Sequence, residues 1–365
     1  MQRAAIPGRL DRHGCACYRP FMDYVLSDVD AVGSGLGRAA HGLAGKSRLR
    51  FARRLVEVGA ELVGAELLDR LAPLRAEILA TEPGSAPRQG RSVGLYLHWS
   101  GSGRVSAMVL RQLALWRAAG FDMVFVTNAT PPAADWDAVA VETVLRIRRR
   151  NVGRDFGAWR DAAALALDGQ PAPEELLLAN DSVLGPFLPL DPLVDTWRGG
   201  GEGLFGMTES WGGGPHLQSY ALLARGAGAV AGLCAHLARQ RDSRSKWRTV
   251  QGGEIGLTRA MLAEGHRCGA LFGYARLAAG LDAAERATFG PRFGDAAAVL
   301  RYPLNPTHHL WRVLVERHGF PYLKTELVRR NPGHLPGVEQ WRDVVPPPML
   351  GMIEEHLAML DTGAP

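Results

Sequence analysis

Between Arg91 and Ala179, short apolar runs alternate with helix-like segments, and this alternation constrains the fold more than any other feature. Four runs have the length and composition of buried strands: Ser92–His98, Asp122–Thr127, Thr143–Ile147 and Glu175–Ala179. Apolar residues recur at helical spacing in two of the intervening segments, Arg104–Ala119 and Phe156–Leu167. Strands separated by helices form right-handed βαβ units. The sequence therefore predicts an α/β fold with a mostly parallel sheet flanked by helices.

The sheet is expected to continue beyond Asp181. Further strands are predicted at Leu204–Thr208, Leu217–Ala224 and Cys268–Phe272. In sheets of this kind, ligands bind beyond the carboxyl ends of the parallel strands. The chemistry is therefore expected in the loops that follow His98, Asn128, Arg148 and Ala179.

Length and composition are those of a globular protein. The chain has 365 residues, of which 47% are hydrophobic and 22% charged, and this excludes a collagen-like, coiled-coil or largely disordered chain. The formal net charge is +5. Such a mild excess suits an acidic ligand, such as a diphosphate, or a membrane surface, and is too small for a nucleic-acid-binding protein.

The cysteines and the N-terminal sequence predict a cytoplasmic protein. Cys15, Cys17, Cys234 and Cys268 are too few and too irregular for a disulfide framework, and no pair at zinc spacing accompanies the first two. The N-terminal sequence MQRAAIPGRLDRHG lacks the apolar run of a signal peptide. No segment approaches the ~18 consecutive apolar residues that span a bilayer.

Residues 1–90 differ from the rest and are predicted to form a helical extension. A helix is expected over Lys46–Ala80, and its first residues are basic without an acid. Such a helix is suited to peripheral contact with the inner face of a membrane; the favoured alternative is a solvated helix packed on the rest of the protein. Glu82–Gly90 is rich in proline and glycine, as in a linker. The expected domains are the extension (1–90), an α/β domain (91–335) and a helical tail (336–365).

Several common enzyme classes are excluded by their motifs. The turn Gly101-Ser102-Gly103 follows a strand, but Ser106 stands where a dinucleotide-binding turn needs its third glycine. The phosphate-binding loop G-x-x-x-x-G-K-[ST], the nucleophile elbow G-x-S-x-G and the zinc motif H-E-x-x-H are all missing from the sequence. The common dehydrogenases, nucleotidases, esterases and zinc proteases are therefore excluded.

Two polar segments follow predicted strands. In RRRNVGRDFGAW, a glycine turn opens a helix, where Arg154 and backbone amides favour an anion and Asp155 can accept hydrogen bonds from hydroxyls. Asn180, Asp181 and Ser182 follow the last apolar strand, where a carboxylate can hold a divalent cation that neutralises a diphosphate. The alternatives are a solvated helix cap and a turn whose side chains bond their own backbone. Together the two segments have the donor-site layout of nucleotide-sugar transferases.

Four blocks of the sequence resemble the rhamnan synthesis protein F family. They are NVGRDFGAW, LLLANDSVLGPF, HLQSYALL and GFPYLKTELVRRNP, and the resemblance spans Arg91 to Pro332. That family comprises bacterial glycosyltransferase-like proteins of rhamnose-polysaccharide and lipopolysaccharide assembly. The order of motifs is also similar to family 2 glycosyltransferases, which carry an Asp-x-Asp motif. Here the motif is Asn-Asp-Ser, so only Asp181 matches, and the need for a metal stays open.

The resemblance implies a GT-A-like nucleotide-diphospho-sugar transferase fold and a set of site residues. The expected nucleotide-sugar-binding residues are His98, Asn128, Asn151, Gly153, Arg154, Asp155, Asn180, Ser182, Gln218 and Lys324. Lys324 is expected to reach a phosphate, or else to be a solvated charge. A metal, Mg²⁺ or Mn²⁺, would be held by Asp181 and by His308 or His309. The alternative for these adjacent histidines is a helix cap after Pro306.

The resemblance also places a catalytic base at Glu254, in a segment expected to open a helix. Glu254 would take the proton of the acceptor hydroxyl, with Asp181 as the second catalytic residue. Its alternative is a favourable position at the positive end of a helix, and Glu209 is the competing candidate.

The expected function is transfer of a sugar, with rhamnose as the expected one, from a dTDP-, UDP- or GDP-linked donor. The acceptor would be a growing cell-surface polysaccharide or lipopolysaccharide, lipid-linked or not. Two alternatives remain: a non-catalytic GT-A-like scaffold module of a polysaccharide-assembly complex, and a nucleotide-dependent oxidoreductase.

Overall fold

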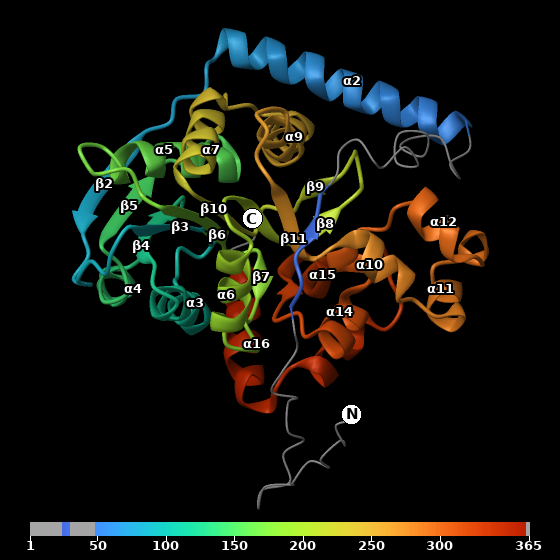
Figure 1. The fold of residues 1–365 in the computed structure, drawn as a ribbon. Coiled ribbons are helices and arrows are strands. Elements are labelled where there is room, and N and C mark those ends of the chain that lie inside the picture. The colour runs from blue at the N-terminus through green and yellow to red at the C-terminus, as the bar shows by residue number, and fades with distance from the viewer. Residues whose placement is uncertain (1–23, 30–47, 363–365) are drawn as a thin grey trace, which may run out of the picture.

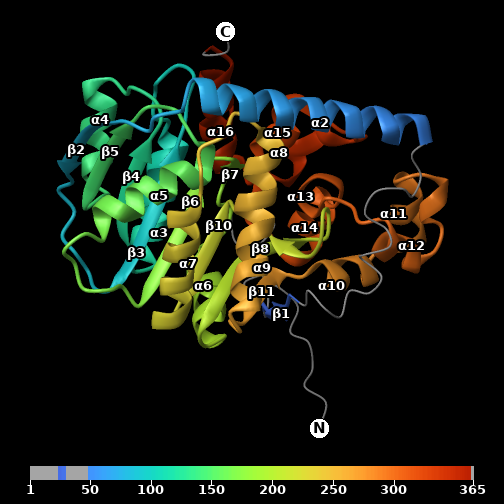
Figure 2. The same cartoon turned by 90° about the horizontal axis from the view of Figure 1, so that it is seen from above.

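A ten-stranded sheet runs through the molecule, with helices on both faces (Figures 1 and 2). The computed structural model describes residues 24–29 and 48–362. The strands lie in the order β1-β11-β8-β10-β6-β3-β4-β5-β2, and β9 pairs with β8. Four consecutive strands of this order are mutually parallel: β6 (Glu175–Asn180), β3 (Ser92–His98), β4 (Asp122–Thr127) and β5 (Leu145–Arg149). The predicted α/β class is confirmed, and the arrangement is compatible with a Rossmann-like GT-A fold.

The other half of the sheet is mixed. Strand β10 (Ala221–Arg225) runs antiparallel between β6 and β8 (Gly203–Ser210), and β11 (Cys268–Phe272) runs parallel to β8. The predicted strand over Leu217–Ala224 is two strands, because β9 (His216–Leu217) pairs with the end of β8 and only β10 lies in the sheet between β6 and β8.

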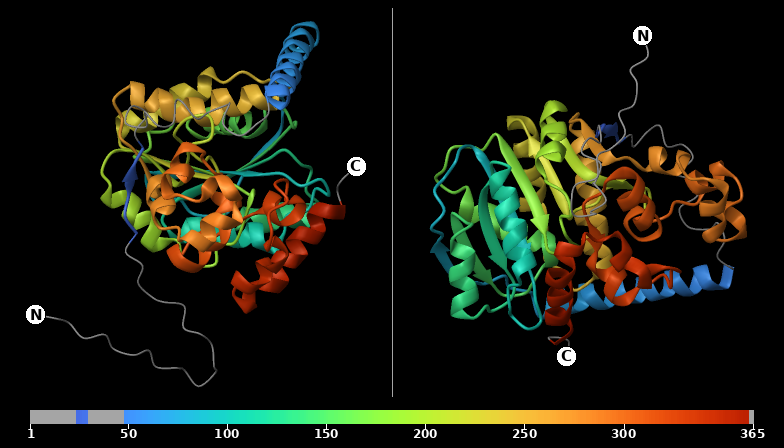
Figure 3. Two further views of the ribbon diagram at one scale, coloured as in Figure 1. Left: turned by 90° about the vertical axis from the view of Figure 1, so that its right-hand side faces the viewer. Right: turned by 90° about the horizontal axis from the view of Figure 1, so that it is seen from below.

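Alternate side chains of the central strands enter two separate apolar cores. Tyr96 of β3 packs with α3 (Ala107–Ala118), α6 (Asp191–Gly199) and α16 (Pro347–Thr362) on one face. Leu95 and Leu97 pack with α5 (Arg154–Ala166), α7 (Ala227–Arg239) and α9 (Gly256–Ala263) on the other. This is the two-residue period of a strand covered on both faces, and Figure 3 (left) shows the two helical layers above and below the sheet.

Short elements fill the remainder of the chain. They are β7 (Val183–Leu184) paired with β12 (Leu323–Lys324), and the helices α4 (Ala133–Ala140), α8 (Lys246–Thr249), α10 (Tyr274–Ala279), α11 (Ala283–Thr288), α12 (Ala296–Arg301), α13 (Pro306–His309), α14 (Trp311–His318) and α15 (Thr325–Arg330). The π-helix η1 (Val250–Ile255) joins α8 to α9, and two 3₁₀-helices lie at η2 (Pro291–Phe293) and η3 (Val338–Val344).

The N-terminal segment contributes one long helix and both edge strands of the sheet. Helix α2 (Arg48–Leu71) ends before Pro73, a residue that cannot continue a helix, so the predicted helix through Ala80 is too long. Strand β2 (Ile78–Pro83) follows and pairs antiparallel with β5, so the first two residues of the predicted linker are strand. Strand β1 (Ser27–Asp28) pairs with β11. Cys15, Cys17 and Lys46 lie outside the described residues, and the domain boundary at residue 90 stays a prediction.

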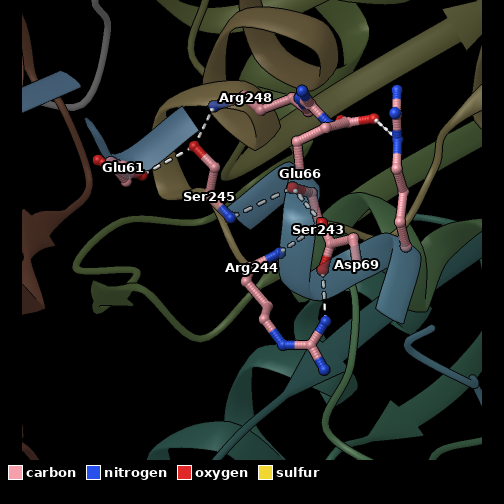
Figure 4. Close-up of polar contacts among 8 residues, drawn as sticks. Glu61, Glu66, Asp69, Ser243, Arg244, Ser245 and Arg248 are labelled. Carbon is pink, nitrogen blue, oxygen red and sulfur yellow. Dashed lines mark hydrogen bonds and ion pairs between the residues drawn. The ribbon is translucent and has the colours of Figure 1, made fainter. Parts of the chain in front are cut away.

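Hydrogen bonds and an ion pair hold helix α2 against α8 and the loop that precedes it (Figure 4). Asp69 accepts hydrogen bonds from Ser243 Oγ at 3.1 Å and from Arg244 Nη1 at 2.5 Å. Glu66 pairs with Arg248 at 2.6 Å, and Glu61 accepts from Ser245 Oγ at 2.8 Å. The helix therefore turns its acidic side toward the body.

The opposite side of α2 carries apolar side chains exposed to solvent. Val56, Val63 and Leu67 are 70%, 62% and 56% exposed, and their spacing places them on one side of the helix. Within the described ranges, no helix combines the length and apolar character needed to cross a bilayer.

Candidate functional site

A cavity of about 460 Å³ opens at the carboxyl ends of β3, β4, β5 and β6. Parallel strands all end at the same edge of a sheet, so residues far apart in sequence meet there. The lining residues are Leu97, Trp99, Asn128, Asn151, Arg154, Asp155, Phe156, Asn180, Asp181, Ser182, Ser219, Thr249, Val250 and Glu254. Eight of the predicted site residues are among them: Asn128, Asn151, Arg154, Asp155, Asn180, Asp181, Ser182 and Glu254.

The start of α5 is shaped by a glycine turn. Gly153 has φ +76° and Arg154 has φ +53°, so the chain enters the helix through two left-handed residues. A Cβ atom on Gly153 would lie 1.9 Å from Asp242 Oδ1, so this position excludes a side chain as well as favouring glycine. Gly153 does not line the cavity, and its role is to let the loop at Asp242 pack against the turn that presents Arg154 and Asp155.

A hydrogen-bonded chain connects α5 to β6 and then to β12. Asn180 Nδ2 donates to Asp155 Oδ2 at 3.0 Å, and Asn180 Oδ1 accepts from the Ser182 amide at 3.1 Å and from its hydroxyl. Lys324 Nζ donates to Ser182 Oγ at 2.9 Å. The alternative interpretation of this segment was a turn whose side chains bond their own backbone. Asn180 does so, through the Ser182 amide.

Asp181 is oriented by a different contact. Its Oδ2 accepts a hydrogen bond from the Trp99 amide at 2.8 Å, across from β6 to the end of β3. Burial raises the pKa of Asp181 to about 7, and the negative charge of Asp155 adds to the rise. Burial also raises the pKa of Asp155, against the lowering effects of Lys324, Arg154 and the Asn180 hydrogen bond. Two half-buried carboxylates that line one cavity suit a divalent cation, since carboxylate oxygens are the ligands that Mg²⁺ and Mn²⁺ prefer.

Glu254 lines the same cavity from the π-helix η1. Its Oε1 accepts a hydrogen bond from the Ser219 amide at 2.9 Å. The helical segment begins at Lys246 rather than near Glu254, so the prediction that this segment opens a helix is wrong. The alternative role at a positive helix end is excluded for the same reason. A π-helix widens one turn and is frequent at functional sites.

Two predicted binding residues are buried beside the cavity instead of lining it. His98 Nδ1 lies 2.9 Å from Thr127 Oγ1, and burial lowers the pKa of this imidazole to about 3. Gln218 Oε1 accepts from Thr208 Oγ1 at 2.7 Å. Their contacts fix the ends of neighbouring strands.

The competing base and the expected histidine ligand also lie away from the cavity lining. Glu209 accepts hydrogen bonds from Trp211 Nε1 and from the Tyr274 amide, and both of its carboxylate oxygens are occupied. Neither His308 nor His309 lines the cavity that holds Asp181, and burial lowers the pKa of both histidines. Among residues 24–29 and 48–362, no three His, Cys, Asp or Glu side chains gather as a metal-binding group.

A second cavity of about 290 Å³ adjoins the first. Both cavities are lined by Trp99, Asp181 and Ser182, and the second adds Lys324, Thr325, Glu326, Arg329, Arg330 and Leu360. Lys324 thus lines the second cavity rather than the first. The sequence analysis missed Trp99, Ser219, Arg329 and Arg330. The sequence held a signal for three of them, because the arginines belong to the GFPYLKTELVRRNP block and Trp99 directly follows a predicted strand.

Fold and cavity together define an α/β protein with a cavity lined by acids and an arginine at its strand ends, and the fold is compatible with a Rossmann-like GT-A fold. No protein-family model matches the chain. The chain is similar to the virulence protein VirA of Vibrio anguillarum strain ATCC 68554 / 775 and to VirA of Vibrio anguillarum, with 27% identity over 203 residues in each case. The match covers 52% of this chain and 64% of each VirA protein. The resemblance to the rhamnan synthesis protein F family stays a prediction.

Proposed function

We propose that the chain is a glycosyltransferase that moves a sugar from a nucleotide diphosphate-sugar donor to a growing cell-surface polysaccharide, with rhamnose as the expected sugar. The observation that carries the proposal is one cavity that brings Arg154, Asp155 and Asp181 together with Glu254. The first three suit a diphosphate and its cation, and the fourth suits proton transfer. The name virulence protein, printed for the VirA relatives, is compatible with a surface-polysaccharide product.

The donor would occupy the strand ends. Asn128 and Asn151 offer amide groups to the nucleotide, and Arg154 offers a cation to the diphosphate. Asp155 and Asp181 would hold Mg²⁺ or Mn²⁺, which neutralises charge on the leaving diphosphate when it is bound. Ionised Asp181 is favoured by the Trp99 amide, so this contact prepares the carboxylate for a cation.

Glu254 would serve as the base of an inverting transfer. The Ser219 amide fixes its Oε1, which leaves the other oxygen to accept the proton of the acceptor hydroxyl. As the acceptor oxygen bonds to the anomeric carbon, the bond from that carbon to the diphosphate breaks. The electron pair leaves with the nucleoside diphosphate.

Titration of the purified protein with UDP, GDP and dTDP in the presence of Mg²⁺ tests the donor site. One of the three should bind, and Arg154→Ala should weaken that binding about tenfold or more. Arg111→Ala, on α3 and outside the cavity, is the matched control and should leave binding unchanged. Failure of all three nucleotides to bind would contradict the proposal.

A scaffold function is the second candidate, favoured by the exposed apolar side of α2 at Val56, Val63 and Leu67. A scaffold would use this surface for a partner and would not turn over a donor. Hydrolysis or transfer of a nucleotide-sugar by the purified protein, abolished in Asp181→Ala, would eliminate the scaffold function.

A further inference from the structure

The second cavity is lined by more positive than negative charge. Lys324, Arg329 and Arg330 come from one short segment, β12 and α15, which also carries Glu326, and the other acid of the lining is Asp181. Because the cavity shares Asp181 and Ser182 with the first one, a group bound in it would lie beside the proposed donor.

Lys324 has hydrogen-bonding capacity to spare. Its Nζ donates to Ser182 Oγ at 2.9 Å and lies 4.6 Å from the centre of the Tyr220 ring. An ammonium group has three donors, and within the described part of the chain Lys324 forms no ion pair. Burial lowers the pKa of Lys324, and the charges of Glu254, Asp155, Glu326 and Asp181 oppose that lowering. These carboxylates favour the ammonium form, which has donors left for a phosphate oxygen.

The two arginines differ in how firmly they are held. Arg329 is fixed by the last turn of α16, through Asp361 Oδ1 at 2.7 Å and the Leu360 carbonyl oxygen at 2.9 Å. Arg330 is exposed and forms neither a hydrogen bond nor an ion pair with the described residues. One guanidinium is therefore preoriented at the cavity, and the other is available to close on a ligand.

We propose that the second cavity is a phosphate subsite that binds the phosphate ester of a saccharide acceptor, with Lys324 and Arg330 as its principal contacts. The proposal rests on the proposed glycosyltransferase function, since it assigns the acceptor to the cavity next to the donor. Trp99, 44% exposed, and Leu360 line the same cavity and offer an apolar surface to a sugar face or to the first carbons of a lipid chain. A free sugar phosphate and a lipid-linked one share this chemistry.

The test uses glucose 1-phosphate and farnesyl phosphate as probes, titrated into the full chain with the nucleotide that binds best present at saturation. Wild type should bind at least one probe at millimolar concentration. Arg330→Gln and Lys324→Met should each weaken that binding about tenfold, whereas Arg301→Gln, on α12 and outside both cavities, should leave it unchanged. Tighter binding of farnesyl phosphate assigns a lipid-linked source, and equal binding assigns a free one.

The same titrations separate the two proposals. Melting curves of each variant confirm that it is folded, and the exposed position of Arg330 keeps that substitution interpretable. Binding of neither probe at 10 mM (a concentration on the order of ten times a millimolar dissociation constant), or binding insensitive to Arg330→Gln and Lys324→Met, would overturn the subsite. If no nucleotide binds but the probe binding depends on Arg330, the donor proposal fails and the phosphate site stands.

Discussion

The ring of Phe156 occupies the space that a side chain on residue 253 would need. A Cβ atom on Gly253 would lie 2.5 Å from Phe156 Cδ2, so the π-helix packs directly on α5. Phe156 follows Asp155, and Glu254 follows Gly253. This contact therefore packs the helix start that carries Asp155 against the π-helix that carries Glu254.

Substitution of this glycine should disturb both stability and the site. We expect Gly253→Ala to lower the free energy of unfolding by about 1–3 kcal/mol, the usual cost of overpacking, and to weaken nucleotide binding. Gly252→Ala is the control, because its Cβ would lie 3.7 Å from Gln240 Oε1, an ordinary contact. Denaturant unfolding and nucleotide titration measure the two effects. Equal behaviour of the two variants would contradict the proposed packing role.

The raised pKa of Asp181 predicts a pH-dependent gain in stability for Asp181→Asn. The ordinary value is 3.8 and the folded value is about 7, so the folded state holds the proton more tightly than the unfolded chain. The wild type therefore loses stability as pH rises from about 4 to about 7 and bears the full cost above 7. Asparagine has no such cost. The variant should melt above wild type at pH 8 and by a smaller margin at pH 5, and a margin independent of pH would show that the carboxyl titrates normally.

The same substitution should abolish most of the transferase activity. Without its negative charge, residue 181 no longer favours a cation at the leaving diphosphate. We expect the rate to fall on the order of a hundredfold or more while the protein stays folded. Asp168→Asn, an exposed acid after α5, should retain the wild-type rate. Near-native activity of Asp181→Asn would remove Asp181 from the donor site.

Glu254→Gln separates proton transfer from folding. Glutamine keeps the oxygen that accepts from the Ser219 amide, so melting temperature and nucleotide binding should be preserved. The transfer rate should fall by roughly a hundredfold to ten-thousandfold, as for loss of a general base. Glu209→Gln should instead lower the melting temperature, because Glu209 accepts from Trp211 and Tyr274 inside the protein. The reverse pattern would make Glu209 the base.

Because α2 bonds to the loop that leads into the cavity lining, a substitution on α2 should affect that lining. Asp69→Ala removes the acceptor for Ser243 and Arg244, so residues 243–250 should exchange their amide hydrogens faster. The cost in stability should be about 1 kcal/mol, because the contacts are partly exposed. Arg53→Ala breaks an ion pair within the same helix and should leave that exchange unchanged. Identical exchange in the two variants would show that the loop is held by other contacts.

The sequence predicted the part of the cavity that lies at the ends of the parallel strands. Asp155 and Asp181 line one cavity, because apolar runs mark the strands and parallel strands end together, and their role in a donor site stays a prediction. Glu254 was assigned to the site by resemblance, but the helical segment that holds it begins earlier, at Lys246, and Gly253 packs on Phe156 instead of opening a helix. The periodicity of β10 carries no information on strand direction, so its antiparallel insertion was not predicted.

Contacts between distant segments explain most of the remaining differences. From the sequence, Gly153 was interpreted as part of a ligand-binding turn. In the structure, a side chain at this position would collide with Asp242, which lies 89 residues later in the sequence. Lys324 bonds to Ser182 over a separation of 142 residues. Neither pair leaves a local pattern, because both partners are fixed by how whole elements pack.

Both outermost strands of the sheet, β1 and β2, come from the first 83 residues. Each covers a row of backbone amides and carbonyls that would otherwise face solvent, on β11 at one side and on β5 at the other. Natural sheets protect such open edges, because the unpaired backbone groups can pair with a strand of another molecule. The new edges are poorer templates, since β1 has only two residues and β2 ends at Pro83, and short edge strands and edge prolines disfavour pairing with another chain. A chain shortened to residues 91–365 would keep every cavity residue named above, but it would expose the backbone edges of β5 and β11 to pairing with other molecules.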